Sequence, residues 1–347
     1  MNDAHFIIEN LIFTLNAVMP IVAVIFVGYF LKIIHLFDEK FFQLLNKLCF
    51  RCFLPCLLFY NVYNVERISE IASYGKLCLF AFCSILIFFV VALVLVSLLM
   101  KNSRQKGVML QCAYRSNFAI IGISLAMSIS SGSPEPVIAA SILSSVSIPL
   151  FNVLAIIALS IFVDSESENG IPVKKISVLS IIKKIAKNPL ILGVAAGIFC
   201  LFIRFLIPAG SNGEKLFTVR KNLPFIYKAL SMLAQCASPV ALIALGGNFT
   251  FSAVSRLKTK IIAGVISRTI ICPLVCLFFA AKLGFSSVEF PALIALYGTP
   301  LAVSTVPMTA EMGSDAELAG QLVVWTTLAS AFTLFVIIFT SAQLSLI

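Results

Sequence analysis

Apolar residues in this chain are gathered into ten long blocks, separated by short polar segments. The blocks cover residues 10–31, 44–60, 77–100, 108–128, 137–163, 190–207, 230–249, 261–281, 292–310 and 319–346. A helix of about 20 apolar residues crosses the hydrocarbon core of a bilayer. The blocks lack the polar–apolar alternation of membrane barrel strands, and only helices or closed barrels satisfy their backbones in lipid. The pattern predicts an all-α polytopic membrane protein with ten transmembrane helices.

The ten blocks also read as one five-span unit that occurs twice. Prolines mark corresponding blocks, with Pro20 and Pro55 in the first and second and Pro189 and Pro239 in the sixth and seventh. Five is an odd number, so the second unit must enter the membrane upside down relative to the first. We therefore expect two inverted five-helix repeats, residues 1–163 and 181–347. A polar segment rich in Glu, Ser, Gly and Lys, residues 164–180, is expected to join them as a cytoplasmic linker.

The fourth and ninth blocks are interrupted by residues that do not favour a transmembrane helix. The fourth contains the run Tyr114-Arg115-Ser116-Asn117 and then Gly122, while the ninth contains Gly298-Thr299-Pro300 and then Pro307. Interrupted segments in corresponding places of two halves point to the binding site of a transporter. We expect these helices to cross with their breaks facing each other. The helix N-termini exposed at such a break carry partial positive charge and attract anions.

Composition and charge agree with a membrane protein and limit its partners. Hydrophobic residues make up 60% of the chain and charged residues 12%, against roughly 45–50% and about 25% in soluble domains. Most Lys and Arg residues lie in the connections that are inside if both termini are outside, which predicts extracytoplasmic termini. The net charge of +10 is mostly next to the membrane and suits anionic lipid. Nucleic-acid binding would need a soluble basic domain, and the sequence contains none, so nucleic acid is not an expected partner.

Motifs for enzymatic chemistry are missing from the sequence. It contains no P-loop, no Gly-x-Ser-x-Gly elbow and no HExxH, so we expect no enzyme and no direct use of ATP. The ten cysteines lie mostly within apolar blocks, and only two histidines are present. A zinc site needs four ligands, so we expect neither a metal nor another cofactor.

Carboxylates are also missing from the middle of the predicted spans. Cation and proton carriers usually place Asp or Glu there, so the chain is better suited to an organic anion than to a bare cation. Glu311, at the end of the ninth block, is the only candidate for a proton relay.

Polar residues at the two breaks are the candidates for substrate binding. They are Arg115, Ser116, Asn117, Thr299, Ser304 and Thr305. The Arg115 guanidinium could hold a carboxylate through two parallel hydrogen bonds, or extend to the inner headgroups. The Asn117 amide could bind substrate or connect two helices. The hydroxyl groups could line the site or bond to carbonyls of their own helices.

Four motifs, in order along the chain, resemble those of a known family. They are Met19-Pro20 with Gly28-Tyr29, Leu45-Asn46 with Pro55-Cys-Leu-Leu-Phe59, Arg115-Ser116-Asn117 with Gly122, and Thr299-Pro300 with Asp315-Ala-Glu317. Together they resemble the motifs of the auxin efflux carrier family, which contains the plant PIN-type carriers and their bacterial relatives. The resemblance suggests a bacterial member of this family.

The resemblance implies a scaffold and a transport domain that exchange access by an elevator movement. It places Asn117 at the family's crossover asparagine and Pro300 or Pro307 at the ninth-span break. Gly122 would belong to the fourth-span break, although Ser124 stands where the family usually has proline. Two further prolines, Pro55 and Pro239, would bend the second and seventh helices beside the crossing.

These observations predict a secondary transporter of a small organic anion in the plasma membrane. The expected substrate is a mono- or dicarboxylate, auxin-like or malate-like, with the carboxylates of bacterial relatives favoured over auxin. H⁺ and Na⁺ are the candidate coupling ions, the lipid bilayer is the expected surroundings, and a homodimer is a candidate assembly. Two alternatives remain open: a sodium-coupled organic-anion symporter of the bile-acid type, and a sensor that keeps the transporter fold without turnover.

Overall fold

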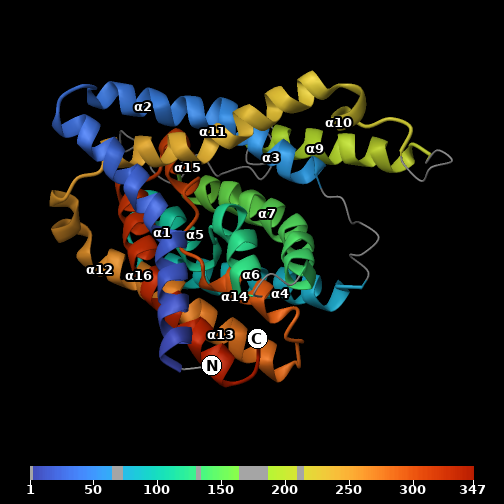
Figure 1. Ribbon diagram of the computed structural model, residues 1–347. Coiled ribbons are helices and arrows are strands. Elements are labelled where there is room, and N and C mark those ends of the chain that lie inside the picture. The colour runs from blue at the N-terminus through green and yellow to red at the C-terminus, as the bar shows by residue number, and fades with distance from the viewer. Residues whose placement is uncertain (1–2, 65–72, 130–133, 164–186, 209–214) are drawn as a thin grey trace.

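A computed structural model describes residues 3–64, 73–129, 134–163, 187–208 and 215–347 of the chain (Figure 1). This part is helical and contains no β-strand. The predicted linker, residues 164–180, lies outside it. The first-half helices are α1 (Asp3–Ile33), α2 (Glu39–Leu48), η1 (Cys49–Phe53), α3 (Leu54–Tyr63), α4 (Gly75–Leu99), α5 (Ser103–Tyr114), η3 (Phe118–Gly122), α6 (Ile123–Ile129) and α7 (Pro134–Val163). The second-half helices are α9 (Pro189–Leu206), α10 (Val219–Asn222), α11 (Pro224–Asn248), α12 (Ser252–Ile266), η4 (Ser267–Ile271), α13 (Cys272–Lys282), α14 (Phe290–Gly298), α15 (Thr305–Glu311) and α16 (Ala316–Gln343).

Seven helical segments of the described residues are long and apolar enough to cross a membrane. They are Glu39–Tyr63, Gly75–Leu99, Glu135–Phe162, Pro189–Leu206, Pro224–Asn248, Ser252–Lys282 and Ala316–Gln343. The first, fourth and ninth predicted blocks are not among them. The first contributes a shorter apolar helix, Val18–Ile33, and the other two are interrupted. The chain is thus a multi-pass, all-helical membrane protein.

The helices form two groups that lie one above the other in Figure 1. The upper layer consists of α2, η1, α3, α9, α10 and α11, which pack on one another. The lower bundle consists of α4 to α7 and α12 to α16. Helix α1 packs against α11 of the upper layer and against α16 of the lower bundle. Each group therefore contains helices from both halves of the chain.

Two glycines allow α1 and α11 to approach until their backbones touch. A Cβ atom at Gly28 would overlap the carbonyl oxygen of Ile243, and one at Gly246 would overlap that of Ile25. Small residues at helix contacts are typical of membranes, where close packing replaces the hydrophobic effect as the main attraction between helices. This contact attaches α1 to the upper layer.

Two of the long helical segments contain a π-helical turn followed by proline. In Glu39–Tyr63 the turn η1 precedes Pro55, and in Ser252–Lys282 the turn η4 precedes Pro273. Proline donates no backbone hydrogen bond, and its ring crowds the carbonyl four residues earlier. A wider turn at this point accommodates both effects, so these helices continue through the proline.

Candidate functional site

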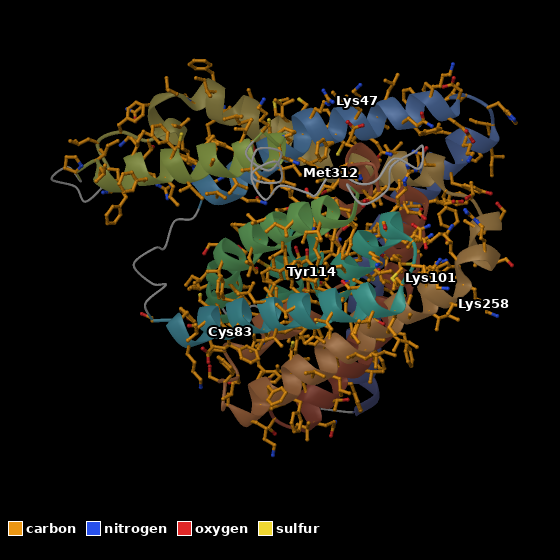
Figure 2. All side chains as sticks on the ribbon, turned by 180° about the vertical axis from the view of Figure 1, so that it is seen from behind. Lys47, Cys83, Lys101, Tyr114, Lys258 and Met312 are labelled. Atoms are coloured by element: carbon orange, nitrogen blue, oxygen red, sulfur yellow. The ribbon has the colours of Figure 1, made fainter. Side chains whose placement is uncertain are left out.

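The interruptions of the fourth and ninth blocks lie side by side inside the protein. Helix α5 ends at Tyr114 and α14 ends at Gly298. Between the ends, Ser116 and Leu301 form an isolated antiparallel bridge, and the backbone N–H of Asn117 donates to the Pro300 carbonyl over 2.8 Å. Figure 2 places Tyr114 near the middle of the molecule. Two short extended segments therefore cross where the helices stop.

Three residues expected at the breaks lie in helices instead. Gly122 closes the π-turn η3, Ser124 lies in α6, and Pro307 lies in the first turn of α15. The fourth-block break covers residues 115–117 and comes before both Gly122 and Ser124. A side chain at Gly122 would overlap the ring of Phe118, so this glycine provides space for a neighbouring side chain. Proline suits the first turn of a helix because the amide it lacks would have no intrahelical partner.

Arg115 is buried at the crossing, with 1% of its surface exposed. Its Nη1 donates to Gln111 Oε1 over 2.7 Å and to Thr305 Oγ1 over 3.4 Å, and lies 3.1 Å from Met308 Sδ. Its Nη2 donates to Asn152 Oδ1 and to Ser304 Oγ, both over 2.8 Å. The side chain points into the protein and does not extend to the headgroups, one of the two orientations considered from the sequence.

The positive charge of Arg115 is not balanced by any acidic side chain of the described residues. All its hydrogen-bond acceptors are neutral. It also lies beside the beginning of α15, where the helix dipole is positive. Arginine stays protonated in proteins, and an unpaired buried charge costs several kcal/mol. An anion at this point would remove that cost.

Two further polar groups at the crossing have no hydrogen-bond partner among the described residues. They are the Ser116 hydroxyl and the side-chain nitrogen Nδ2 of Asn117, and both residues are buried. Buried polar groups in native proteins are nearly always paired, so an unpaired one calls for an explanation. A hydroxyl and an amide donor next to a guanidinium together form a set of donors suited to an oxyanion.

A narrow cleft, with a cavity volume of about 40 Å³ and one open side, connects these groups to the upper layer. Arg115, Ser116, Asn117, Ser304 and Asn152 line its polar wall. The opposite wall, from the upper layer, consists of Leu54, Leu57, Ala237, Ser238 and Ala241. Pro55 and Pro239 are neighbours in sequence of these lining residues, so both proline-containing helices reach the cleft.

The hydroxyl groups of the ninth block divide into two roles. Ser304 lines the cleft and accepts a hydrogen bond from Arg115. Thr305 also accepts one from Arg115 but does not line the cleft. Thr299 donates to the Ala295 carbonyl over 3.0 Å and is fully buried outside the cleft. Thr299 thus bonds to its own helix, as hydroxyl groups in membrane spans often do.

Arg268 is a second buried arginine, and the sequence reasoning assigned it no role. It lies in η4 with 0% exposure, and its guanidinium donates to the Thr299, Tyr297, Leu296 and Tyr114 carbonyl oxygens. The sequence feature that could have identified Arg268 is its position inside the apolar block 261–281, because charged residues within membrane spans often mark functional positions.

Glu311 lies at the contact between the two helix groups. Its carboxylate is 3.5 Å from Arg51 Nε of η1, and it is mostly buried whereas Arg51 is largely exposed. None of the hydrogen bonds of Arg115 involves Glu311. The carboxylate therefore joins the upper layer to the lower bundle and does not contact the arginine of the cleft.

We expect Glu311→Gln to change the rate of a transport cycle without changing substrate affinity. The substitution keeps the shape of the side chain and removes the ion pair that spans the two groups. A partly exposed pair contributes about 1 kcal/mol or less, so the expected change in rate is about fivefold or less. Equilibrium binding and flux measured on the same preparation test this. A large loss of affinity would contradict it, and Arg51→Gln should reproduce the effect of Glu311→Gln.

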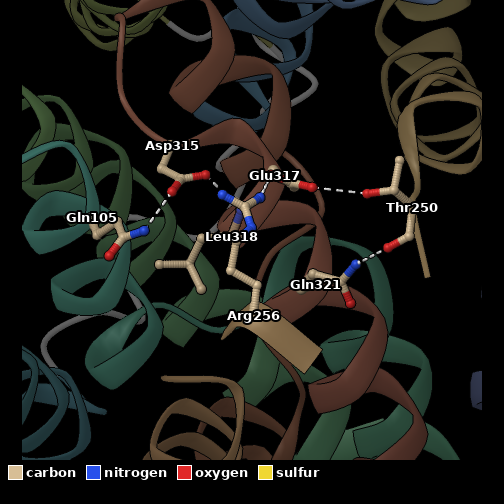
Figure 3. Close-up of polar contacts among 7 residues, drawn as sticks. All are labelled: Gln105, Thr250, Arg256, Asp315, Glu317, Leu318 and Gln321. Atoms are coloured by element: carbon tan, nitrogen blue, oxygen red, sulfur yellow. Dashed lines mark hydrogen bonds and ion pairs between the residues drawn. The ribbon is translucent and has the colours of Figure 1, made fainter. Parts of the chain in front are cut away.

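The start of α16 is held by a separate polar cluster (Figure 3). Asp315 accepts from Gln105 Nε2 over 2.7 Å and from the Leu318 amide over 2.9 Å, which caps the helix. Glu317 accepts from Thr250 Oγ1 and pairs with Arg256. These contacts fasten α16 to α5 and α12 within the lower bundle. The acidic residues of the Asp-Ala-Glu motif therefore serve the packing of the bundle.

Fold and cleft together define a class: a multi-pass helical membrane protein with an anion-suited cleft at two interrupted helices. The profile of the membrane transport protein family matches residues 13–338. The chain belongs to this family, which is that of the auxin efflux and PIN-like carriers, and it is a membrane transporter. No curated protein matches the chain.

Proposed function

We propose that this protein is a secondary transporter of a small organic anion, with the substrate carboxylate bound at the crossing. The observation that carries the proposal is Arg115, a buried guanidinium that faces the cleft and has no acidic partner among the described residues. The unpaired Ser116 hydroxyl and Asn117 amide lie beside it. One carboxylate would supply both the missing charge and the missing hydrogen-bond acceptors.

The proposed substrate class is a small mono- or dicarboxylate, auxin-like or malate-like. The wall opposite Arg115 is mostly apolar, with Ser238 as its polar member. A carbon chain or ring could pack there while the carboxylate meets the guanidinium.

We also propose an elevator movement, in which the lower bundle carries the anion past the upper layer. The cleft lies between these groups, and its charged and amide side chains all come from the bundle. The anion could therefore keep its polar contacts while the bundle moves along an apolar wall. In this proposal the chain is two inverted five-helix repeats, residues 1–163 and 181–347, with the linker 164–180 outside the described residues.

For the orientation we propose a plasma-membrane protein with both termini outside. Lys101 and Lys258 belong to connections that the charge distribution places inside, and both are exposed. They lie on the same side of the molecule in Figure 2, and Cys83 lies on the other side. This grouping supports the proposed inner side, because basic residues are retained on the cytoplasmic face.

Uptake of labelled succinate or malate into proteoliposomes tests the proposed function. A carrier should give saturable uptake that other small carboxylates inhibit, and the same anions should raise the melting temperature of the purified protein. Binding without uptake would indicate a sensor, and uptake only with Na⁺ would indicate a sodium symporter. If a broad panel of carboxylates gives neither uptake nor a thermal shift, the organic-anion proposal is wrong.

We expect Asn117→Ala to weaken carboxylate binding about tenfold, because a hydrogen bond to a charged group contributes about 1.5 kcal/mol or more. Folding should change little, since the side-chain nitrogen that the substitution removes has no hydrogen-bond partner among the described residues. Thr327→Val is the matched control. Its hydroxyl is also buried and has no partner in the part of the chain that the structure describes, but Thr327 is not a cleft residue. Equal loss of affinity in both variants would argue against the assignment of Asn117.

A further inference from the structure

Arg268 occupies a position that is otherwise suited to a metal cation. Its Nε donates to the Thr299 carbonyl over 3.0 Å. Its Nη2 donates to the Tyr297 and Leu296 carbonyls over 2.8 and 3.3 Å, and Nη1 donates to the Tyr114 carbonyl over 3.3 Å. Four backbone oxygens, from α5, α14 and the residue after α14, thus surround one buried positive charge, and Nη1 also donates to Cys272 Sγ over 3.5 Å.

These oxygens belong to the ends of the two helices that stop at the crossing. Tyr114 is the last residue of α5, while Leu296 and Tyr297 lie in the last turn of α14, just before Thr299. The last four carbonyls of a helix have no partner within it. Each helix C-terminus carries roughly half a negative charge. Two such ends together balance one guanidinium, so Arg268 is compensated without a carboxylate.

The surroundings of Arg115, at the same crossing, differ from those of Arg268. Arg115 also has no acidic partner among the described residues, but its acceptors are neutral side chains beside the positive end of α15. One arginine is therefore balanced by helix ends and the other is left for an anion. Arg268 does not line the cleft, so the two charges have separate surroundings.

Unwound carbonyls and the C-terminal ends of half-helices are the groups that coordinate coupling Na⁺ in carriers with discontinuous helices. In this chain the guanidinium already binds such groups. We infer that Arg268 is a built-in cation that replaces a coupling ion at the crossing, so that the crossing assembles without Na⁺. The conclusion that transport does not need Na⁺ rests on the transport function proposed above. That Arg268 takes the place of a cation can be tested without any substrate.

The test is the melting temperature of the purified protein in NaCl and in N-methylglucamine chloride at equal ionic strength. The wild type should melt at the same temperature in both salts. Arg268→Ala leaves four buried carbonyls without their donor, so it should melt at least about 5 °C lower in N-methylglucamine chloride. Millimolar Na⁺ or methylguanidinium should restore a substantial part of this loss, because either ion can enter the space left by the side chain. Tetramethylammonium, which donates no hydrogen bond, should not.

If the alanine variant does not fold, the same melting temperatures measured on Arg268→Lys and on the wild type still test the inference. The lysine variant keeps the charge and should show no response to Na⁺, even if it melts somewhat lower than the wild type. Stabilisation of the wild type by Na⁺ would overturn the inference, and so would an alanine variant that folds but responds to neither ion. No carboxylate is present in these measurements, so their failure would not be confused with failure of the anion-transport proposal.

Discussion

Replacing Arg115 with glutamine is expected to abolish high-affinity binding of small carboxylates and to leave the protein at least as stable as before. The guanidinium would provide the charge opposite the carboxylate, and truncating one partner of a buried charge pair typically costs about 2–5 kcal/mol. At about 1.4 kcal/mol per factor of ten, this corresponds to a loss of affinity between roughly 30-fold and roughly 4,000-fold. Carboxylate titration followed by thermal shift, with flux in liposomes, measures it.

Stability separates a binding role for Arg115 from a structural one. Without an anion the buried charge lacks an acidic partner among the described residues, so its removal relieves a desolvation cost. Glutamine can still bond to the polar side chains around it. Arg115→Lys is the matched control, because it keeps the charge but loses the planar pair of donors, and it should retain weak binding. A glutamine variant that unfolds, or one that binds carboxylate normally, would contradict the assignment.

The two breaks could be located from the sequence because the residues that cause them are polar or lack a backbone donor. Asn117 and Pro300 lie in the extended segments that cross. Gly122 and Ser124, which were expected at the break, come five and seven residues after its last residue, Asn117, and lie in helices. Glycine ends a helix when the backbone needs it, but here its missing side chain makes room for Phe118. That use depends on a neighbouring ring whose position the sequence pattern does not reveal.

The hydrogen-bond partners of the two buried arginines could not be predicted from the sequence, because they too depend on how distant segments pack. The acceptors of Arg115 come from α5, α7 and the segment that leads into α15. Those of Arg268 come from α5, α14, the residue after α14 and Cys272 at the start of α13. Only the crossing brings these elements together. An arginine in an apolar block indicates function, but whether its charge is balanced depends on which helix ends it meets.

The attachment of α1 to the upper layer leads to the second large effect, which is expected at Gly246. We expect Gly246→Ala to lower the yield of folded protein and its free energy of unfolding by about 3 kcal/mol, the upper end of the usual cost of overpacking. The new Cβ would overlap the carbonyl oxygen of Ile25. This atom is backbone, so no rotamer change can relieve the overlap and α1 must move away from α11.

The helix preference of alanine opposes this effect, but it is too weak to cancel it. Alanine favours a helix over glycine by about 1 kcal/mol, so the net result at Gly246 should still be destabilising. Gly75→Ala is the matched control, because a Cβ there, at the start of α4, has no atom within 4 Å. That variant should be neutral or slightly more stable. Melting temperature and the monodisperse yield in detergent compare the two variants directly. If Gly246→Ala were as stable as Gly75→Ala, α1 would not be seated against α11. The upper layer would then lack the close contact that would let it act as a fixed support in the elevator movement proposed above.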